Sequence, residues 1–321
     1  MSDLLNERDE MPLSILQADA ADLHDILGGP TLFHLRGRRE PALFVSVLMH
    51  GNETTGWDAV REVLRGFVGV DGFDLPRSLS LFIGNTAAAQ VGMRHLEGQP
   101  DYNRVWPGSD TDGTPEHELM RTVMDRMADR EMFASIDIHN NTGRNPHYAC
   151  VNVLEHQSLH LAALFGRTVV YFVRPRGVAS MAMAALGPSV TLECGKVGHQ
   201  HGTAHAAEYL RAALQLSEIP SHRVARHDVD LYHTVAIVRV EQLYPLREQA
   251  RYREREEGVE QDVAVLGQID MGAHVGTADL LVIKEATAVL GPHDPAEARG
   301  LDEVPEVPVD HEPSRRGGRI E

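Results

Sequence analysis

Apolar positions along the chain fall into short, almost continuous runs separated by longer amphipathic stretches. Such runs are typical of strands buried on both faces. Residues 54–67 instead repeat at helical spacing, and a second helix is predicted to start with Thr114 as N-cap and Pro115 in its first turn. The alternation predicts an α/β fold with helices on both faces of a sheet. The runs cover residues 31–35, 42–49, 78–84, 133–138, 148–154, 168–173 and 189–194.

The pattern changes at both ends of this region. Residues 16–27 show a weak helical repeat, and past residue 221 short β-rich runs with glycine turns replace the helical periodicity. The charge-dense stretch 247–261 indicates a solvated loop or helix face. We therefore expect three parts, which are an α/β domain over 1–220, a smaller β-rich domain over 221–291 and a disordered tail over 292–321.

Composition narrows the partners and the location. The 321 residues carry 30 Lys and Arg against 47 Asp and Glu, a net charge of −17, so an acidic surface would repel nucleic acid. Apolar runs fall short of the roughly 20 residues that span a membrane, and the N-terminus lacks a signal-peptide pattern. Only Cys150 and Cys194 are present, which cannot form a disulfide framework. We expect a cytoplasmic protein without nucleic-acid or membrane partners. The composition leaves open whether the chain forms a homo-oligomer.

The 18 histidines prompt a search for metal chemistry. His50 and Glu53 follow the run 42–49 and precede a predicted helix, a position where ligands gather in open α/β sheets. Zinc accepts a histidine nitrogen and a glutamate oxygen, and catalytic sites usually offer three protein ligands. Gly51 permits the tight turn between them. By itself this spacing also occurs by chance.

Two further strand ends carry polar residues. His139 follows the run 133–138, and Asp137 can either orient its imidazole or make a plain structural hydrogen bond. Glu193 ends the run 189–194, where it can act as a general base or form a strand-end salt bridge. Together these strand ends predict one catalytic zinc site.

An irregular segment between the strand ends holds Arg94, Asn103 and Arg104. These side chains are either solvated loop residues or ligands of a substrate. A guanidinium can bind a carboxylate in a bidentate manner, and a second one can stabilise a developing oxyanion.

The ordered motifs give the chain a family resemblance. It resembles the succinylglutamate desuccinylase/aspartoacylase family of the zinc metallocarboxypeptidase superfamily over residues 42–205. The motifs are His-Gly-Asn-Glu at 50–53, Gly-Met-Arg at 92–94, Asp-Tyr-Asn-Arg at 101–104, Asp-Ile-His at 137–139 and Leu-Glu-Cys-Gly at 192–195. The resemblance implies a carboxypeptidase-like mixed sheet, one zinc ion per chain and a C-terminal β domain that narrows the entrance. The resemblance implies that His50, Glu53 and His139 are metal ligands and that Glu193 is the general base. It implies that Arg94 stabilises the oxyanion and that Asn103 and Arg104 bind the substrate carboxylate.

The sequence therefore predicts a zinc hydrolase that removes the acyl group from a small, carboxylate-bearing N-acyl amino acid. One alternative is a carboxypeptidase or peptide amidase with the same zinc core. Another is a non-catalytic metal-binding relative. The acyl group and the amino acid are left open. A second metal site at His199, His201 and His205 is a further alternative, because His201 and His205 share a helix face.

Overall fold

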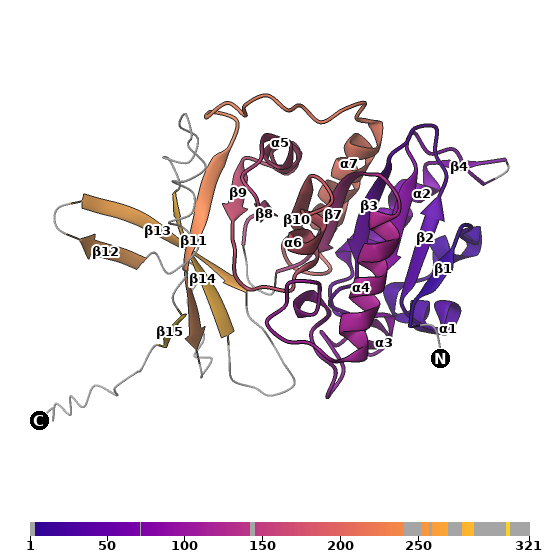
Figure 1. Ribbon diagram of the computed structural model, residues 1–321, viewed down its shortest axis with the longest axis horizontal. Coiled ribbons are helices and arrows are strands. Elements are labelled where there is room, and N and C mark those ends of the chain that lie inside the picture. The colour runs from indigo at the N-terminus through magenta and orange to yellow at the C-terminus, as the bar shows by residue number, and fades with distance from the viewer. Residues whose placement is uncertain are drawn as a thin grey trace, which may run out of the picture.

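The computed structural model describes residues 4–70, 72–141, 145–240, 252–256, 259–268, 278–285 and 306–308, with side chains up to residue 234. Its centre is a mixed sheet with the strand order β1-β2-β6-β3-β7-β10-β8-β9-β11-β14-β13-β12, and β15 pairs with β11 (Figure 1). The strands are β1 (Asn6–Arg8), β2 (Thr31–Leu35), β3 (Ala42–Val47), β6 (Leu79–Ile83), β7 (Met132–His139), β8 (Tyr148–Val151), β9 (Thr168–Tyr171), β10 (Ser189–Glu193), β11 (Asp230–Val240), β12 (Tyr252–Glu256), β13 (Val259–Gln268), β14 (Ala278–Glu285) and β15 (Glu306–Pro308), with β4 (Val68–Gly69) and β5 (Gly72–Phe73) as a separate pair.

Helices cover both faces of the sheet, as the sequence predicts. Successive residues of β3 belong to different cores. Leu43 and Val45 pack in the core that includes α2 and α7, while Phe44 packs in the core that includes α4 and α6. Because successive side chains point to opposite faces and both faces are covered, β3 is buried at every position. The helices are α1 (Leu23–Leu27), α2 (Thr55–Arg65), α3 (Thr86–Gln90), α4 (Pro115–Ala128), α5 (His156–Phe165), α6 (Ala179–Met183) and α7 (Gln200–Gln215), and the 3-10 turns are Leu13–Gln17, Ala20–Asp22 and Tyr102–Arg104.

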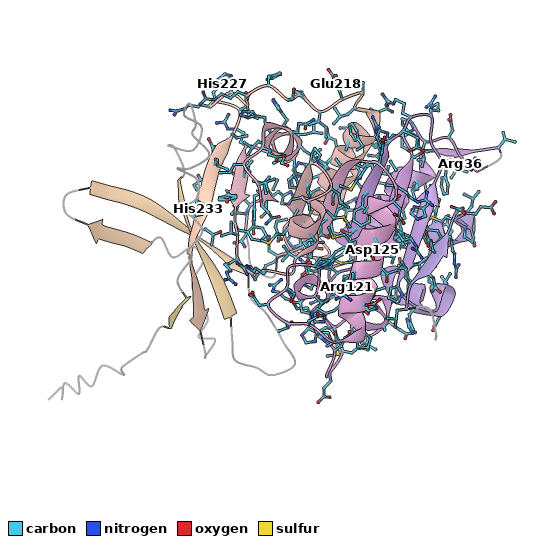
Figure 2. All side chains as sticks on the ribbon, viewed as in Figure 1. Arg36, Arg121, Asp125, Glu218, His227 and His233 are labelled. Carbon is cyan, nitrogen blue, oxygen red and sulfur yellow. The ribbon has the colours of Figure 1, made fainter. Side chains whose placement is uncertain are left out.

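The side chains of α4 divide between a buried face and an exposed face. Val123 and Met127 are buried against the sheet, whereas Arg121 and Asp125 are exposed on the opposite side of the helix (Figure 2). The predicted start also holds, since α4 begins at Pro115 directly after Thr114. An amphipathic helix with a proline in its first turn is thus read correctly from sequence.

Two predictions of local structure are wrong. The weak helical repeat at residues 16–27 is not one helix, because it is divided into two 3-10 turns and the short helix α1. Within the stretch 247–261, residues 252–256 form strand β12, which pairs with β13, instead of a loop or helix face. Charged side chains are common on sheet edges, where they discourage pairing with other chains, and this strand is such an edge.

The β-rich C-terminal region continues the main sheet. Strand β11 pairs in parallel with β9, and His233 on β11 stacks on Tyr171 of β9 with ring centroids 5.2 Å apart. Of the predicted tail 292–321, only residues 306–308 are described, as strand β15, and the rest lies outside the described residues. The domain boundaries stay a prediction. Among the described helices, none has the length and apolar character needed to cross a membrane.

Candidate metal-dependent active site

Three neighbouring strands bring the polar strand ends to one edge of the sheet. Strand β3 pairs in parallel with β7, and β7 pairs in parallel with β10. His139 closes β7 and Glu193 closes β10, and the two residues are direct partners in the strand register. Because parallel strands share one carboxyl edge, the loop after β3 delivers His50 and Glu53 to the same place.

The loop after β3 has an unusual backbone. Leu48 is buried and has a φ of 57°, which is the left-handed region that a leucine rarely adopts. Gly51 lies against α3, and a Cβ there would come within 2.3 Å of the backbone nitrogen of Ala89. Packing on both sides therefore fixes the turn that carries His50 and Glu53.

The carboxylate of Glu53 lies between two imidazoles. Its Oε1 is 2.8 Å from Nδ1 of His50, and its Oε2 is 2.9 Å from Nδ1 of His139. One ligand atom of each residue lies within 4.8 Å of the others, and all three residues are buried. The predicted convergence of these side chains is confirmed. Two imidazole nitrogens and one carboxylate oxygen are a donor set that suits zinc.

Each imidazole has an acidic partner on its far nitrogen. Nε2 of His50 lies 3.0 Å from Oδ1 of Asp101, and Nε2 of His139 lies 2.7 Å from Oδ2 of Asp137. Metal-ligating histidines usually have such a partner, which fixes the ring and leaves the other nitrogen for the ion. The expected Asp137 contact is present. Sequence reasoning did not single out Asp101, although it opens the Asp-Tyr-Asn-Arg motif.

The charges of this cluster favour a bound cation. Burial alone would raise the pKa of Glu53, but the positive charge of His50 and the hydrogen bond from His139 hold this pKa well below its usual range. Burial would lower the pKa of His139, yet Asp137 and Glu53 raise it well above the usual value. Without an ion, a proton on His139 thus supplies the positive charge that the buried carboxylates require.

Glu193 has the opposite electrostatic character. Burial raises the pKa of its carboxyl to about 8, with added repulsion from Glu53 and Asp137, which outweighs attraction by His139 and Arg94. Asn141 donates from Nδ2 to Oε2 of Glu193 at 2.9 Å. A carboxyl that titrates near neutral pH can both accept and release a proton at that pH.

Asn140 and Asn141 are polar site residues to which sequence reasoning assigned no individual role. The backbone N–H of Asn140 donates to Oε2 of Glu53 at 3.0 Å, and its side chain donates to the carbonyl of Gly195 at 2.8 Å. Oδ1 of Asn141 is buried without a hydrogen-bond partner among the described residues. The available signal was the polar run that directly follows His139.

The residues predicted to contact the substrate lie beside this cluster. Arg94 donates from Nε and Nη2 to Oδ2 of Asp101 at 3.1 and 2.9 Å, and its Nη1 lies 3.4 Å from Oε1 of Glu53. Nδ2 of Asn103 lies 3.2 Å from Nε2 of His139. Arg104 is partly exposed and donates to the carbonyl of Asn103 at 2.7 Å. The structure thus brings Arg94 and Asn103 to the cluster and ties Arg104 to Asn103.

The fold and the cluster together define an α/β protein with a candidate metal centre at the carboxyl edge of its sheet. Residues 39–218 match the succinylglutamate desuccinylase/aspartoacylase catalytic domain. The matched part is more than half of the chain, and the protein therefore belongs to the succinylglutamate desuccinylase/aspartoacylase family, whose members are hydrolytic deacylases. No curated protein matches the sequence significantly.

Solved structures share the fold at low sequence identity. Succinylglutamate desuccinylase from Vibrio cholerae is 13% identical with a TM-score of 0.56, over 76% of this chain and 82% of that one. The enzyme of the same name from Chromobacterium violaceum is 17% identical with a TM-score of 0.54, over 76% and 85%. A product-bound ectoine utilization protein from Ruegeria pomeroyi is 17% identical with a TM-score of 0.51, over 79% and 85%.

Proposed function

We propose that this protein is a zinc-dependent amidohydrolase that removes the acyl group from a small N-acyl amino acid. The observation that carries the proposal is the carboxylate of Glu53 held between Nδ1 of His50 and Nδ1 of His139, on the sheet edge that also bears the buried Glu193. Membership of a family of deacylases supports the reaction class.

His50, Glu53 and His139 would hold the metal. When bound, Zn²⁺ supplies a Lewis acid that polarises a carbonyl and lowers the pKa of water. Asp101 and Asp137 keep the two imidazoles turned so that both Nδ1 atoms face Glu53. Burial of all three ligands keeps competing water away from the ligand atoms.

Glu193 would carry a proton from the attacking water to the leaving amine. Its carboxylate accepts a proton from the attacking water, whose oxygen bonds to the amide carbon, and then delivers that proton to the amine nitrogen as the C–N bond breaks. The products are a carboxylic acid and a free amino acid. The pKa of about 8 that burial gives Glu193 suits a group that takes and returns a proton near neutral pH, and the hydrogen bond from Asn141 orients it.

Arg94 would stabilise the negative charge that develops on the carbonyl oxygen, and Asn103 and Arg104 would bind the carboxylate of the substrate. Arginine suits this role because its planar fork matches a carboxylate. Holding the substrate at two places turns binding energy into orientation of the scissile bond. We also propose a cytoplasmic location and no nucleic-acid or membrane partner, in keeping with the acidic composition.

Hydrolysis assays with and without a chelator test the proposal. The panel holds N-acetylaspartate, N-succinylglutamate, further N-acyl amino acids and short peptides. We expect release of free amino acid from an N-acyl amino acid, lost on chelation and restored by Zn²⁺. E193Q should keep its zinc and lose turnover, whereas E118Q, at an exposed ion pair on α4, should behave as wild type.

Two outcomes would contradict the proposed reaction, and a third would contradict the role of Glu193. Cleavage of peptides alone would establish a carboxypeptidase or peptide amidase. Zinc binding without hydrolysis of any panel member would establish a non-catalytic metal-binding relative. Full activity of E193Q would remove Glu193 from the mechanism.

A further inference from the structure

A second group of histidines lies outside the candidate active site. His201 and His205 are four residues apart in α7, so they lie on one face of that helix. His147 comes from the segment just before β8 and is far from them in sequence. Ring centroids are 5.1 Å apart for His147 and His201, 5.1 Å for His147 and His205, and 6.3 Å for the two residues of α7.

Two of these rings already point ligand atoms at each other. Nδ1 of His147 and Nδ1 of His205 are 2.9 Å apart, which requires one proton between two lone pairs. Two imidazole nitrogens that bind one zinc ion at 2.0–2.1 Å with tetrahedral angles are about 3.3 Å apart. Replacing the shared proton by an ion therefore needs a separation only a few tenths of an ångström larger.

Aromatic packing holds the pair in place. The ring of Phe165 stacks on His205 with centroids 4.2 Å apart and an interplanar angle of 11°. Tyr209 packs edge-on against Phe165 at 5.5 Å. Because the ring of His205 is clamped on one face, little side-chain entropy is left to lose when its nitrogen binds an ion.

His201 can complete the set. It is exposed on the first turn of α7, and its ring already lies against that of His147, with the centroids 5.1 Å apart. Histidines four apart on a helix are a known chelating arrangement for zinc. Among the described residues, only His50, Glu53 and His139 have three ligand atoms within 4.8 Å of one another. Without an ion, neither ring nitrogen of His201 therefore lies within this distance of both Nδ1 atoms of the pair.

The local charges keep these imidazoles ready to bind a metal. Burial, together with the charges of His205 and His201, lowers the pKa of His147. Burial and the charge of His201 lower the pKa of His205, against a hydrogen bond from its ring to the Phe165 backbone and the negative charge of Glu208. Neutral imidazoles keep the lone pairs that a metal requires.

We infer that His147, His201 and His205 form a second binding site for a divalent transition metal such as Zn²⁺, with three imidazole ligands and no ligand in common with the first centre. The site is adjacent to the catalytic strand end, because a Cβ on Gly195 would lie 2.9 Å from Nε2 of His147. It does not depend on the proposed hydrolase activity.

Zinc stoichiometry and affinity test the site. The full chain is loaded with excess Zn²⁺, desalted lightly, and measured by metal analysis and by calorimetric titration with Zn²⁺ alone. We expect two ions per chain in the wild type, with a tight and a weaker class. H205F, which keeps a ring against Phe165, and H201A, at an exposed position, should each lose one equivalent and retain the tight class.

H160A is the matched control. His160 also belongs to a histidine pair, with its ring centroid 4.7 Å from that of His222. Its Nε2, however, is hydrogen-bonded to the backbone carbonyl of His222. This variant should keep both ions. Equal zinc content in the wild type and H205F would overturn the inference, whatever the first centre binds. Loss in H205F but not in H201A would overturn the three-ligand site in favour of a two-imidazole one.

Discussion

The two histidine groups of this protein differ in what surrounds each ring. His50 and His139 are buried, and each has a carboxylate on the nitrogen that faces away from Glu53. His147 and His205 are half-buried and face each other, with aromatic rings alongside. Carboxylate partners fix the ring and raise its basicity, which strengthens metal binding, while burial prevents exchange with solvent. We therefore expect the first group to bind a metal ion more tightly than the second.

Removing the central carboxylate should have the largest effect. E53Q takes away the one negative ligand between the two imidazoles, so we expect zinc at the first centre and hydrolysis to be lost together. Metal analysis and the hydrolysis assay measure this. E62Q is the control, because Glu62 forms an exposed pair with Arg211 at 2.7 Å. The comparison would break if E53Q lost zinc from the second group instead.

The outer acidic partners should matter less than the ligand itself. D101N and D137N leave all three ligands in place but weaken the hold on each imidazole, and such changes typically cost about 10–100-fold in metal affinity. Competition with a chelator measures the affinity. D125N, at an exposed position on α4, should be silent. Unchanged affinity in both partner variants would show that burial alone distinguishes the two groups.

A feature can be predicted from the sequence when the residues that determine it are close together in the chain or lie at equivalent strand ends. Residues 31–35 are a strand as predicted, because a short, mostly apolar run between turn-forming and charged residues is a local signal. Convergence of His50 and His139 follows from strand ends in a parallel sheet. Asp101 and Asn140 escape this reasoning, since their contacts depend on how loops fold back over the edge.

The same reason applies to the second group and to the edge of the sheet. His201 and His205 show their common face in the sequence, but His147 reaches them only through the packing of α7 against the region before β8. Residues 252–256 look like a solvated segment because their charges alternate with few apolar residues. Their strand depends on antiparallel pairing with β13, which the charge pattern of this segment by itself does not show.

The two regions should also respond to pH with opposite signs in the metal-free protein. The folded-state pKa of Glu193 is raised to about 8, so its stabilising proton is present at low pH and is lost as pH rises from about 5 toward 8. The pKa values of His147 and His205 are lowered in the folded state, so their contribution is present at neutral pH and is lost as pH falls below about 6.5.

Unfolding by denaturant across this pH range separates the two. One proton changes the free energy of unfolding by at most about 1.4 kcal/mol for each pH unit. E193Q should flatten the decline on the alkaline side and leave the acid side unchanged. H205F should reduce the loss on the acid side by a smaller amount, because its site is more exposed to solvent. If both variants altered the same side, the contrast between a buried, carboxylate-lined centre and a half-exposed imidazole group would not hold.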